Sequence, residues 1–496
     1  MTFANAIKNE EKWTLTENGA VALNTTSDKV LNLFSTVGAL RNTDNTRIET
    51  KVADAFNENP LLTLKCLFWA RDIREGAGER ETFRVAMRYL ANHHPWAVKA
   101  NLHLFGEYGR FDDLYCLVDT TVEEDMWKYV QKQLAEDMSA VLQGSTSVSL
   151  LAKWLKTADA SSPKTRQLGI YTAKKLGLSV YTYKRMVRKL RKYLNIVETK
   201  MCANNWEGIK YDEVPSRASM IYREAFKRHD EERYKNFINK AISGEVKINA
   251  STLYPYDLIE KYESSNWYSY WKEEEDASVE ALWKNLPNYV EPGTNAVVIA
   301  DTSGSMSGRP MNSAIGLAIY FAERNTGPYH NLWMNFSTNP SWQQLHGETL
   351  QQKLHSINMD NWDGSTNMEA AFRLVLNTAI KNGVKPEEMP KSIIVISDME
   401  INGWGGQSYL LGSWTFYDKM RADFAAHGYE IPQVIFWNVN SRHDVFHADS
   451  THNGVVLCSG QSTTTFKNLI NSIGMTPTEY MMSVLNSKRY EAVKAA

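Results

Sequence analysis

The chain has 496 residues, of which 43% are hydrophobic and 23% are charged. This composition is typical of a globular protein and excludes a disordered or fibrous one. The 55 lysines and arginines nearly balance the 57 aspartates and glutamates, which leaves a formal net charge of −2. Near-neutral charge excludes a uniformly basic nucleic-acid coat protein but allows a basic patch on one face. At roughly 100–200 residues per domain, the length predicts about two to four domains.

The cysteines and the longest apolar segments indicate the compartment. The four cysteines are Cys66, Cys116, Cys202 and Cys458. They lack the spacing of a metal site or a disulfide framework, which favours a reducing environment. Neither the start of the chain nor any later segment approaches the ~18 uninterrupted apolar residues of a membrane span. We therefore expect an intracellular, cytoplasmic protein without a membrane partner.

The first half of the chain has the pattern of consecutive helices, from about residue 24 to about residue 283. Apolar-rich segments such as 61–71 and 81–92 are separated by Gly, Pro, Asn and Asp, and β-branched alternation is rare. Helix pairs without a strict sequence period predict an irregular, HEAT-like helical-repeat array. Such an array leaves a long concave surface for a partner.

After about residue 287 the pattern changes, and short apolar runs typical of buried parallel strands alternate with helices. The predicted strands are 296–300, 332–336, 392–397 and 433–437, and the predicted helices are 311–324, 368–382 and 418–427. This order predicts a doubly wound, Rossmann-like α/β domain, with two last helices on its outside at 466–473 and 477–493. We therefore expect a multidomain protein with a helical domain over residues 1–285 and an α/β domain over residues 286–496.

Oxygen-bearing side chains gather at the predicted strand ends of the α/β domain. Asp301, Ser303 and Ser305 follow its first strand, Thr366 lies in a later loop, and Asp398 directly follows the strand 392–397. In an open parallel sheet, ligands bind at the carboxyl ends of the strands. Carboxylates and hydroxyls are hard donors that suit Mg²⁺ better than Zn²⁺. The alternative is that the first two residues only cap the next helix, but three such motifs in this order favour a metal site.

The order of these motifs resembles the metal-ion-dependent adhesion site of von Willebrand factor A domains. The resemblance covers about the last 200 residues and includes all five motif positions. It implies that Ser303, Ser305 and Thr366 contact a divalent cation directly, and that Asp301 and Asp398 act directly or through waters. The cation would be Mg²⁺, or another divalent ion such as Mn²⁺ or Ca²⁺. In that family, a carboxylate from a protein partner commonly completes the coordination.

The loop after Asp398 combines glycines with large aromatic residues, among them Trp404 and Trp414. Aromatic side chains beside a cation would suit a partner-binding rim. The alternative is that these rings fold back onto the helical half.

A basic segment lies in the helical half, and it contains no Asp or Glu. Its eight basic residues are Lys174, Lys175, Lys184, Arg185, Arg188, Lys189, Arg191 and Lys192. Apolar residues from Tyr183 to Val197 recur at helical spacing, so the basic residues occupy the outward face of an amphipathic helix. This concentration predicts a surface for a polyanion such as RNA, with nearby tyrosines for base stacking. The alternative is a solvated face whose charge is offset by acidic neighbours.

Other segments of the helical half resemble the TROVE module, the HEAT-like helical ring of the Ro autoantigen. They are 71–80, 107–114, Pro215-Ser216 and Tyr222-Arg223. Ro-like proteins close this ring with a von Willebrand A domain, in the order seen here. The chain is most similar to a TROVE-like family carrying that domain in phages and cellular genomes. The resemblance implies binding of small non-coding or misfolded RNAs, with structured RNA on the outer face and single-stranded ends in the ring. From residues 71–80 themselves, we expect a structural role for the glycine turn and its arginines.

The sequence carries no phosphate-binding loop and no nucleophile elbow, so we expect a binding protein, not an enzyme. The polar, histidine-containing stretch 442–452 is interpreted as a solvated loop, not a metal cluster. The leading hypothesis is a Ro-like RNA-binding ribonucleoprotein component with a metal-dependent site for a carboxylate-bearing partner. The alternatives are an assembly scaffold that binds no nucleic acid, and a metal-dependent nuclease.

Overall fold

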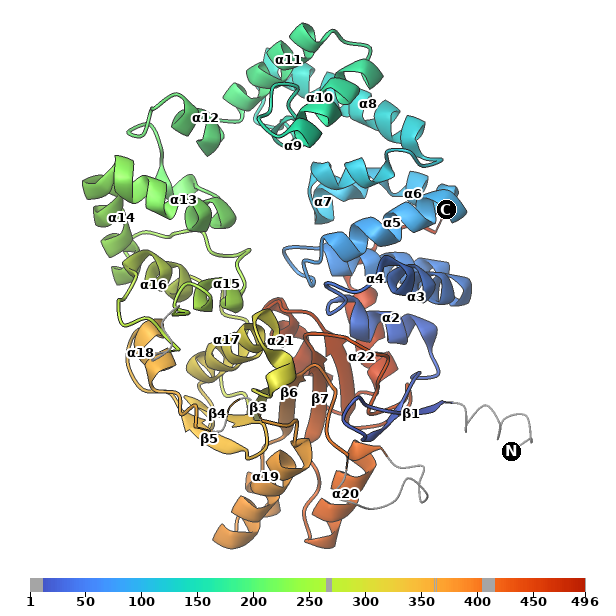
Figure 1. Cartoon of the computed structure of the whole chain (residues 1–496), viewed down its shortest axis with the longest axis vertical. Coiled ribbons are helices and arrows are strands. Elements are labelled where there is room, and N and C mark those ends of the chain that lie inside the picture. The colour runs from blue at the N-terminus through green and yellow to red at the C-terminus, as the bar shows by residue number, and fades with distance from the viewer. Residues whose placement is uncertain (1–11, 265–269, 361, 363, 404–414, 496) are drawn as a thin grey trace.

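The computed structural model describes residues 12–264, 270–360, 362, 364–403 and 415–495. Within these ranges, an α-helical N-terminal part is followed by an α/β part built on one mixed, mostly parallel sheet (Figure 1). None of the helices in these ranges is both long and apolar enough to cross a lipid bilayer.

The N-terminal part begins with a short antiparallel hairpin and continues as helices. The hairpin strands are β1 (Trp13–Leu15) and β2 (Val21–Leu23). The α-helices are α2 (Lys29–Val37), α3 (Asn45–Glu58), α4 (Pro60–Arg71), α5 (Glu81–His93), α6 (Pro95–Ala100), α7 (Phe105–Tyr108), α8 (Glu123–Leu142), α9 (Leu151–Trp154), α10 (Pro163–Lys175), α11 (Val180–Tyr193), α12 (Val197–Cys202), α13 (Ser216–His229), α14 (Glu231–Ser243), α15 (Pro255–Ile259) and α16 (Ala277–Lys284). The 3₁₀ turns are η1 (Leu102–Leu104), η2 (Phe111–Leu117) and η3 (Tyr211–Glu213).

Side-chain caps explain where several of these helices begin. Asp28 precedes α2 and accepts a hydrogen bond from the backbone N–H of Leu31 at 2.7 Å. Asn59 caps α4 in the same way, with Pro60 at the first helical position. Ser179 caps α11. Each cap satisfies a backbone donor that the first turn of a helix leaves unpaired.

The C-terminal part is an open sheet of six strands with helices on both faces. Its strands are β3 (Ala296–Asp301), β4 (Leu332–Phe336), β5 (Ser341–Gln344), β6 (Ser392–Ser397), β7 (Gln433–Asn438) and β8 (Val455–Ser459). Its α-helices are α17 (Arg309–Arg324), α18 (Leu350–His355), α19 (Met368–Asn382), α20 (Phe416–Ala426), α21 (Thr464–Leu469) and α22 (Pro477–Leu485). Its 3₁₀ turns are η4 (Gly304–Met306), η5 (Pro386–Glu388), η6 (Ile470–Ser472) and η7 (Lys488–Tyr490).

The strand order is β5-β4-β3-β6-β7-β8, and all neighbours are parallel except β4 and β5. The chain passes from β3 outward to β4 in one direction and later returns to β6 on the other side. The gap between the carboxyl ends of β3 and β6 is therefore the topological switch point, where open α/β sheets bind their ligands. Asp301 ends β3, and Asp398 follows β6 directly.

Alternate residues of the buried strands pack into two different hydrophobic cores, one on each face of the sheet. In β3, Val298 and Ala300 pack with α17 and with the core of the helical part. Val297 and Ile299 pack on the opposite face, with α19, α20 and the β1–β2 hairpin. The sheet is thus covered on both faces, as its buried and mostly apolar central strands require.

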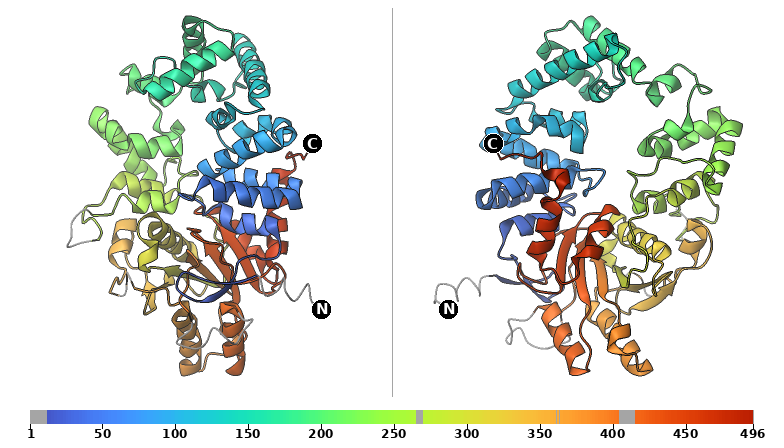
Figure 2. Two further views of the ribbon diagram at one scale, coloured as in Figure 1. Left: turned by 45° about the vertical axis from the view of Figure 1, so that its right-hand side comes forward. Right: turned by 180° about the vertical axis from the view of Figure 1, so that it is seen from behind.

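The helices form an arch whose two limbs both stand on the sheet (Figures 1 and 2). One limb rises through α4, α5 and α7 to α8, and the other descends through α13, α14 and α16 to α17. At the foot of the first limb, Ser459, the last residue of β8, accepts a hydrogen bond from the backbone N–H of Gly38 at 3.0 Å. It also donates to the carbonyl of Phe34 in α2 at 2.9 Å.

Packing crosses the predicted boundary at residues 285/286 in both directions. The β1–β2 hairpin lies against the α/β part, and α22 packs on the strand β8 of the α/β part and also against α2 and α4 of the helical part. Beyond α22, Arg489 pairs with Asp72 through two hydrogen bonds of 2.8 and 3.1 Å. The boundary itself stays a prediction.

A buried ion pair stabilises the first limb. Arg71, at the end of α4, is 2% exposed, and its Nε donates to Asp113 Oδ2 at 2.7 Å. We expect Arg71→Met to lower the free energy of unfolding by about 3 kcal/mol, because Asp113 stays charged and buried. The effect falls at the low end of the usual range because Arg84 still pairs with Asp113 at 2.8 Å. Urea denaturation measures it. Arg80→Met, which breaks only an exposed pair, should change stability by less than about 1 kcal/mol.

Candidate metal centre

Asp301 is the centre of the candidate site at the switch point. Its side chain is fully buried, and both carboxylate oxygens are held. Oδ1 accepts the backbone N–H of Ser303 at 2.9 Å, and Oδ2 accepts the hydroxyl of Ser397 at 2.6 Å. Ser397 is the last residue of β6, so the two central strands orient this carboxylate together.

Three hydroxyl groups converge beside Asp301. Thr366 donates to the hydroxyl oxygen of Ser303 at 3.1 Å, and that oxygen lies 3.2 Å from the hydroxyl of Ser305. Ser303 and Thr366 are buried, whereas Ser305 is exposed. Asn402 accepts the backbone N–H of Thr366 at 3.1 Å and so fixes the loop that carries it. The structure therefore brings together four of the five predicted positions through direct contacts.

Asp398, the fifth predicted position, acts on Asp301 through its charge. It is buried, and its Oδ1 accepts the backbone N–H of Glu400 at 3.1 Å. Burial and the Asp398 carboxylate raise the pKa of Asp301 to about 7, against the lowering effect of its hydrogen bonds from Ser303 and Ser397. Two carboxyl groups that share a buried site resist full ionisation, and a divalent cation relieves that cost. The donor set is all oxygen, so these residues fit Mg²⁺ or another hard ion.

Arg442 is the residue at this site that sequence reasoning missed. Its Nη2 donates to Asp398 Oδ2 at 3.0 Å, and its Nη1 pairs with Glu17 in the turn of the N-terminal hairpin. Burial opposes the guanidinium charge, but Asp398 and Glu17 outweigh it and raise the pKa of Arg442. A protein cation thus already contacts one of the predicted metal-site carboxylates.

The segment 442–452 is not the solvated loop that the sequence predicts. Val445, Phe446 and His447 are buried, and Asp444 pairs with Lys51 of α3 at 2.8 Å. Charged residues of this segment pair both with residues at the carboxyl ends of the strands, where the candidate metal site lies, and with residues of the helical part. These partners lie far away in sequence, so a local polar pattern could not reveal them.

The comparisons with known proteins divide along the same two parts. Residues 16–141 and 147–291 match the family described as "Domain of unknown function (DUF2828)". The chain belongs to this DUF2828 family. Residues 295–495 match a second description, "Domain of unknown function (DUF7788)". An uncharacterized protein from Acanthamoeba polyphaga mimivirus is 28% identical over 508 residues, which cover 95% of this chain and 86% of the relative.

In the DUF2828 part, the eight predicted RNA-binding residues differ in what their side chains contact. Lys175 pairs with Glu124, and Lys184 and Arg188 both pair with Asp159. Arg191 donates to backbone carbonyls at the end of α9 and so holds α11 in place. The other four form no ion pair within the described part of the chain. They are Lys174, Arg185, Lys189 and Lys192, all exposed.

The two predicted rim residues, Trp404 and Trp414, lie outside the residues that the structure describes. The backbone carbonyl of Gly364 accepts the N–H of Gly304 at 3.2 Å, which ties the Thr366 loop to the turn after Asp301.

A pocket of about 740 Å³ lies at the amino ends of the strands, opposite the candidate metal site, where Ile431 and Gly454 precede β7 and β8. It contains none of the predicted site residues. One of its walls is an ion pair, in which His452 contacts Asp418 of α20 at 3.0 Å and Asp449 at 3.4 Å. We assign this cluster to stability and not to ligand binding.

The His452 cluster predicts a pH dependence of stability. Hydrogen bonds to Asp418 and Asp449 raise the pKa of His452 from 6.5 to about 9. The stabilisation is therefore complete below pH 6.5 and is lost as the pH rises through 9, with a loss of about 3 kcal/mol at most. Urea denaturation across this range measures it. His452→Gln should lose most of this pH dependence, and His427→Gln, an exposed histidine after α20, should keep it.

Proposed function

We propose that this protein is an RNA-binding protein of Ro-like architecture, in which an arch of helices stands on a von Willebrand A-like domain. The arch, with both limbs on one α/β sheet, supports this interpretation, as do the TROVE-like segments in its sequence. The order of the two parts is the one that the resemblance implies. A reducing, cytoplasmic location belongs to the same proposal, and it is supported by four free cysteines.

The observation that best supports RNA binding is a row of exposed, positively charged side chains on α11. Arg185, Lys189 and Lys192 recur at four- and three-residue steps, which place them on one side of the helix. Tyr181, one turn before Arg185, is 75% exposed, so an aromatic face adjoins the cations. A positive stripe with an adjoining aromatic ring suits a phosphate backbone with unpaired bases. Binding of a labelled structured RNA with a single-stranded 3′ tail tests this directly.

The observation that carries metal binding is the convergence of Asp301 with the hydroxyls of Ser303 and Thr366 at the switch point. In this proposal these residues, with Ser305 and Asp398, hold a divalent cation. When bound, the cation supplies a Lewis-acidic position for the carboxylate of a protein partner. Calorimetric titration with Mg²⁺ or Mn²⁺ should detect one site per chain. A wild-type chain that binds neither ion would refute this half of the proposal.

Arg442 should compete with the cation for Asp398. We expect Arg442→Gln to raise Mg²⁺ affinity about tenfold, because the guanidinium no longer occupies Asp398 Oδ2 or repels the incoming charge. Without Mg²⁺ the same variant should be less stable by about 1–3 kcal/mol, since Asp398 loses a charge-assisted hydrogen bond. Calorimetry and urea denaturation measure the two effects. Arg442→Lys keeps the positive charge and should show less of both, and equal Mg²⁺ affinity in wild type and Arg442→Gln would exclude competition.

The proposal describes a binding protein and not an enzyme. The buried carboxylates are held by hydrogen bonds and by Arg442, and none of these contacts singles out a catalytic base. Mg²⁺-dependent cleavage of the labelled RNA, lost in Asp301→Asn, would instead favour the nuclease. Metal-dependent capture of a protein without any RNA affinity would favour the scaffold.

A further inference from the structure

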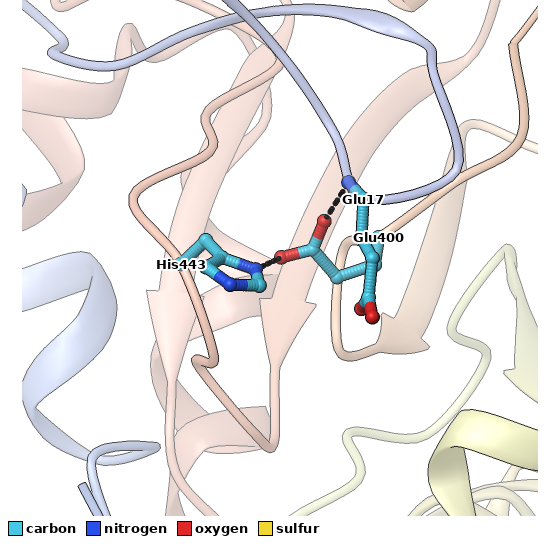
Figure 3. Close-up of side chains that lie close together, drawn as sticks. All are labelled: Glu17, Glu400 and His443. Carbon is cyan, nitrogen blue, oxygen red and sulfur yellow. Dashed lines mark hydrogen bonds and ion pairs between the residues drawn. The ribbon is translucent and has the colours of Figure 1, made fainter.

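Glu17, Glu400 and His443 form a second cluster (Figure 3). Arg442 links it to the Asp301 site, because it pairs with both Glu17 and Asp398. One ligand atom from each residue lies within 4.8 Å of the other two. Glu17 belongs to the turn of the β1–β2 hairpin, Glu400 to the loop after β6, and His443 to the segment after β7. Three segments that are far apart in sequence therefore meet here.

Glu400 is the buried centre of this cluster. Its side chain is fully buried, and both oxygens accept hydrogen bonds. Oε1 faces His443 Nδ1 at 2.9 Å, and Oε2 accepts the backbone N–H of Glu17 at 2.7 Å (Figure 3). When His443 is neutral, both of these donors are uncharged. A buried carboxylate is costly unless a positive charge balances it.

The surrounding charges leave the cluster negative. Arg442 pairs with Glu17 and with Asp398, and it also interacts electrostatically with Glu400. One guanidinium thus faces three carboxylates, two of them fully buried. A bound cation would bring the net charge of Arg442 and these three carboxylates close to zero. A hydrogen bond from a neutral imidazole adds no charge and cannot do this.

The backbone around the cluster is fixed by contacts between the hairpin turn and the loop after β6. Thr16 donates to the carbonyl of Ile401 at 2.6 Å, and Asn18 donates to the carbonyl of Glu400 at 2.5 Å. The N–H of Gly403 donates to the carbonyl of Asn18 at 2.8 Å. The positions of Glu17 and Glu400 are therefore set before any ligand binds, which reduces the cost of assembling a site.

The donors favour a transition ion over Mg²⁺. Imidazole nitrogen with carboxylate oxygen suits Zn²⁺ and its neighbours, whereas Mg²⁺ takes oxygen ligands. At zinc bond lengths of ~2.1 Å, tetrahedral ligand atoms lie about 3.4 Å apart. The 2.9 Å between His443 Nδ1 and Glu400 Oε1 and the 4.8 Å limit of the whole set bracket that separation. His443 would bind through Nδ1, with its proton on Nε2.

We propose that Glu17, Glu400 and His443 bind a zinc-like transition ion that clamps the N-terminal hairpin to the α/β sheet. The side chains of Glu17 and His443 are 48% and 60% exposed, so the ion enters from solvent and keeps a coordination position for water. The site differs from the Asp301 site in residues and in ion type. It does not depend on the proposed RNA or partner binding.

Zinc titration of the metal-free protein tests the proposal. Calorimetry should find one Zn²⁺ per chain, and Co²⁺ should give the visible absorption of a nitrogen- and oxygen-ligated ion. The background is Cys202→Ser, because Cys202 is the exposed thiol among the four cysteines and could bind the metal itself. We expect His443→Ala and Glu17→Gln each to weaken Zn²⁺ binding about 10- to 100-fold or more. Both side chains are partly exposed, so both variants should fold.

The matched controls are His346→Ala and Glu348→Gln, two exposed residues of the same domain that should leave Zn²⁺ binding unchanged. Ser303→Ala should likewise keep Zn²⁺ while it loses Mg²⁺, which separates this site from the proposed function. Hydrogen exchange of residues 12–24 should slow when Zn²⁺ is added. Zinc binding that survives His443→Ala, or zinc that leaves hairpin exchange unchanged, would overturn the proposal, and so would a wild-type chain that binds no Zn²⁺.

Discussion

Asp301→Asn should make the metal-free protein more stable above pH 7 and make it insensitive to Mg²⁺. Burial and Asp398 raise the pKa of Asp301 from 3.8 to about 7, so the folded protein holds a proton that the unfolded chain has released. Ionising this buried carboxyl group lowers the free energy of unfolding. The loss is absent below pH 3.8, grows as the pH rises, and is complete above pH 7, where it amounts to about 4 kcal/mol. Asparagine has the same shape and carries no charge, so the variant avoids this cost.

Urea denaturation at both ends of this pH range, with and without Mg²⁺, measures the effect. At high pH, the wild type should gain stability from saturating Mg²⁺, by about 2.7 kcal/mol at a hundredfold excess over Kd, and the variant should gain none. Asp360→Asn, which replaces an exposed aspartate of the same domain, should behave like wild type. A variant no more stable than wild type at high pH would mean that the buried charge costs nothing. Equal Mg²⁺ stabilisation of both proteins would place the cation elsewhere.

The core of the α/β part could be predicted from the sequence because buried parallel strands are continuous apolar runs. The predicted strand 392–397 coincides with β6, and the predicted helix 368–382 coincides with α19. β5 was missed because it is a polar antiparallel edge strand, Ser341–Gln344. The hairpin strands β1 and β2 have three residues each, too few to show alternation. Their register depends on docking against the sheet and not on a local pattern.

The candidate site was predictable only where its residues follow strands. Asp301 and Asp398 stand at strand ends, and parallel strands bring such ends to one edge. Glu17 lies 383 residues from Glu400, and nothing near it in sequence indicates that contact. The same limit applies to the basic segment. Its sequence contains no acidic residue, but Glu124 of α8 and Asp159 of the turn between α9 and α10 reach it and neutralise part of its charge. The outward face therefore has fewer unpaired cations than the sequence predicts.

Neutralising the four unpaired cations should remove most of the RNA affinity. In the variant with Lys174, Arg185, Lys189 and Lys192 all replaced by glutamine, each substitution removes at most one phosphate contact. Each contact contributes about 0.9 to the slope of log affinity against log salt, so the slope should become shallower by about 3–4. Near physiological salt, this corresponds to a loss of up to roughly 10³-fold in affinity. Fluorescence anisotropy with a tailed RNA hairpin, across a salt series, measures both quantities.

The control removes the same charge from other surfaces, by glutamine substitution at Lys235, Lys240, Lys381 and Lys385, all exposed. If binding depended on net charge alone, both variants would lose affinity equally, and the surface of α10 and α11 would have no special part in it. If only the variant of the four unpaired cations has the shallower slope, the RNA contacts the surface of α10 and α11, because counterion release counts the phosphates that individual side chains neutralise. Binding that is absent or insensitive to salt in the wild type would leave the row on α11 as a solvated helix face. The carboxyl ends of the strands, where the candidate metal site lies, would then be the surface on which to seek a protein partner.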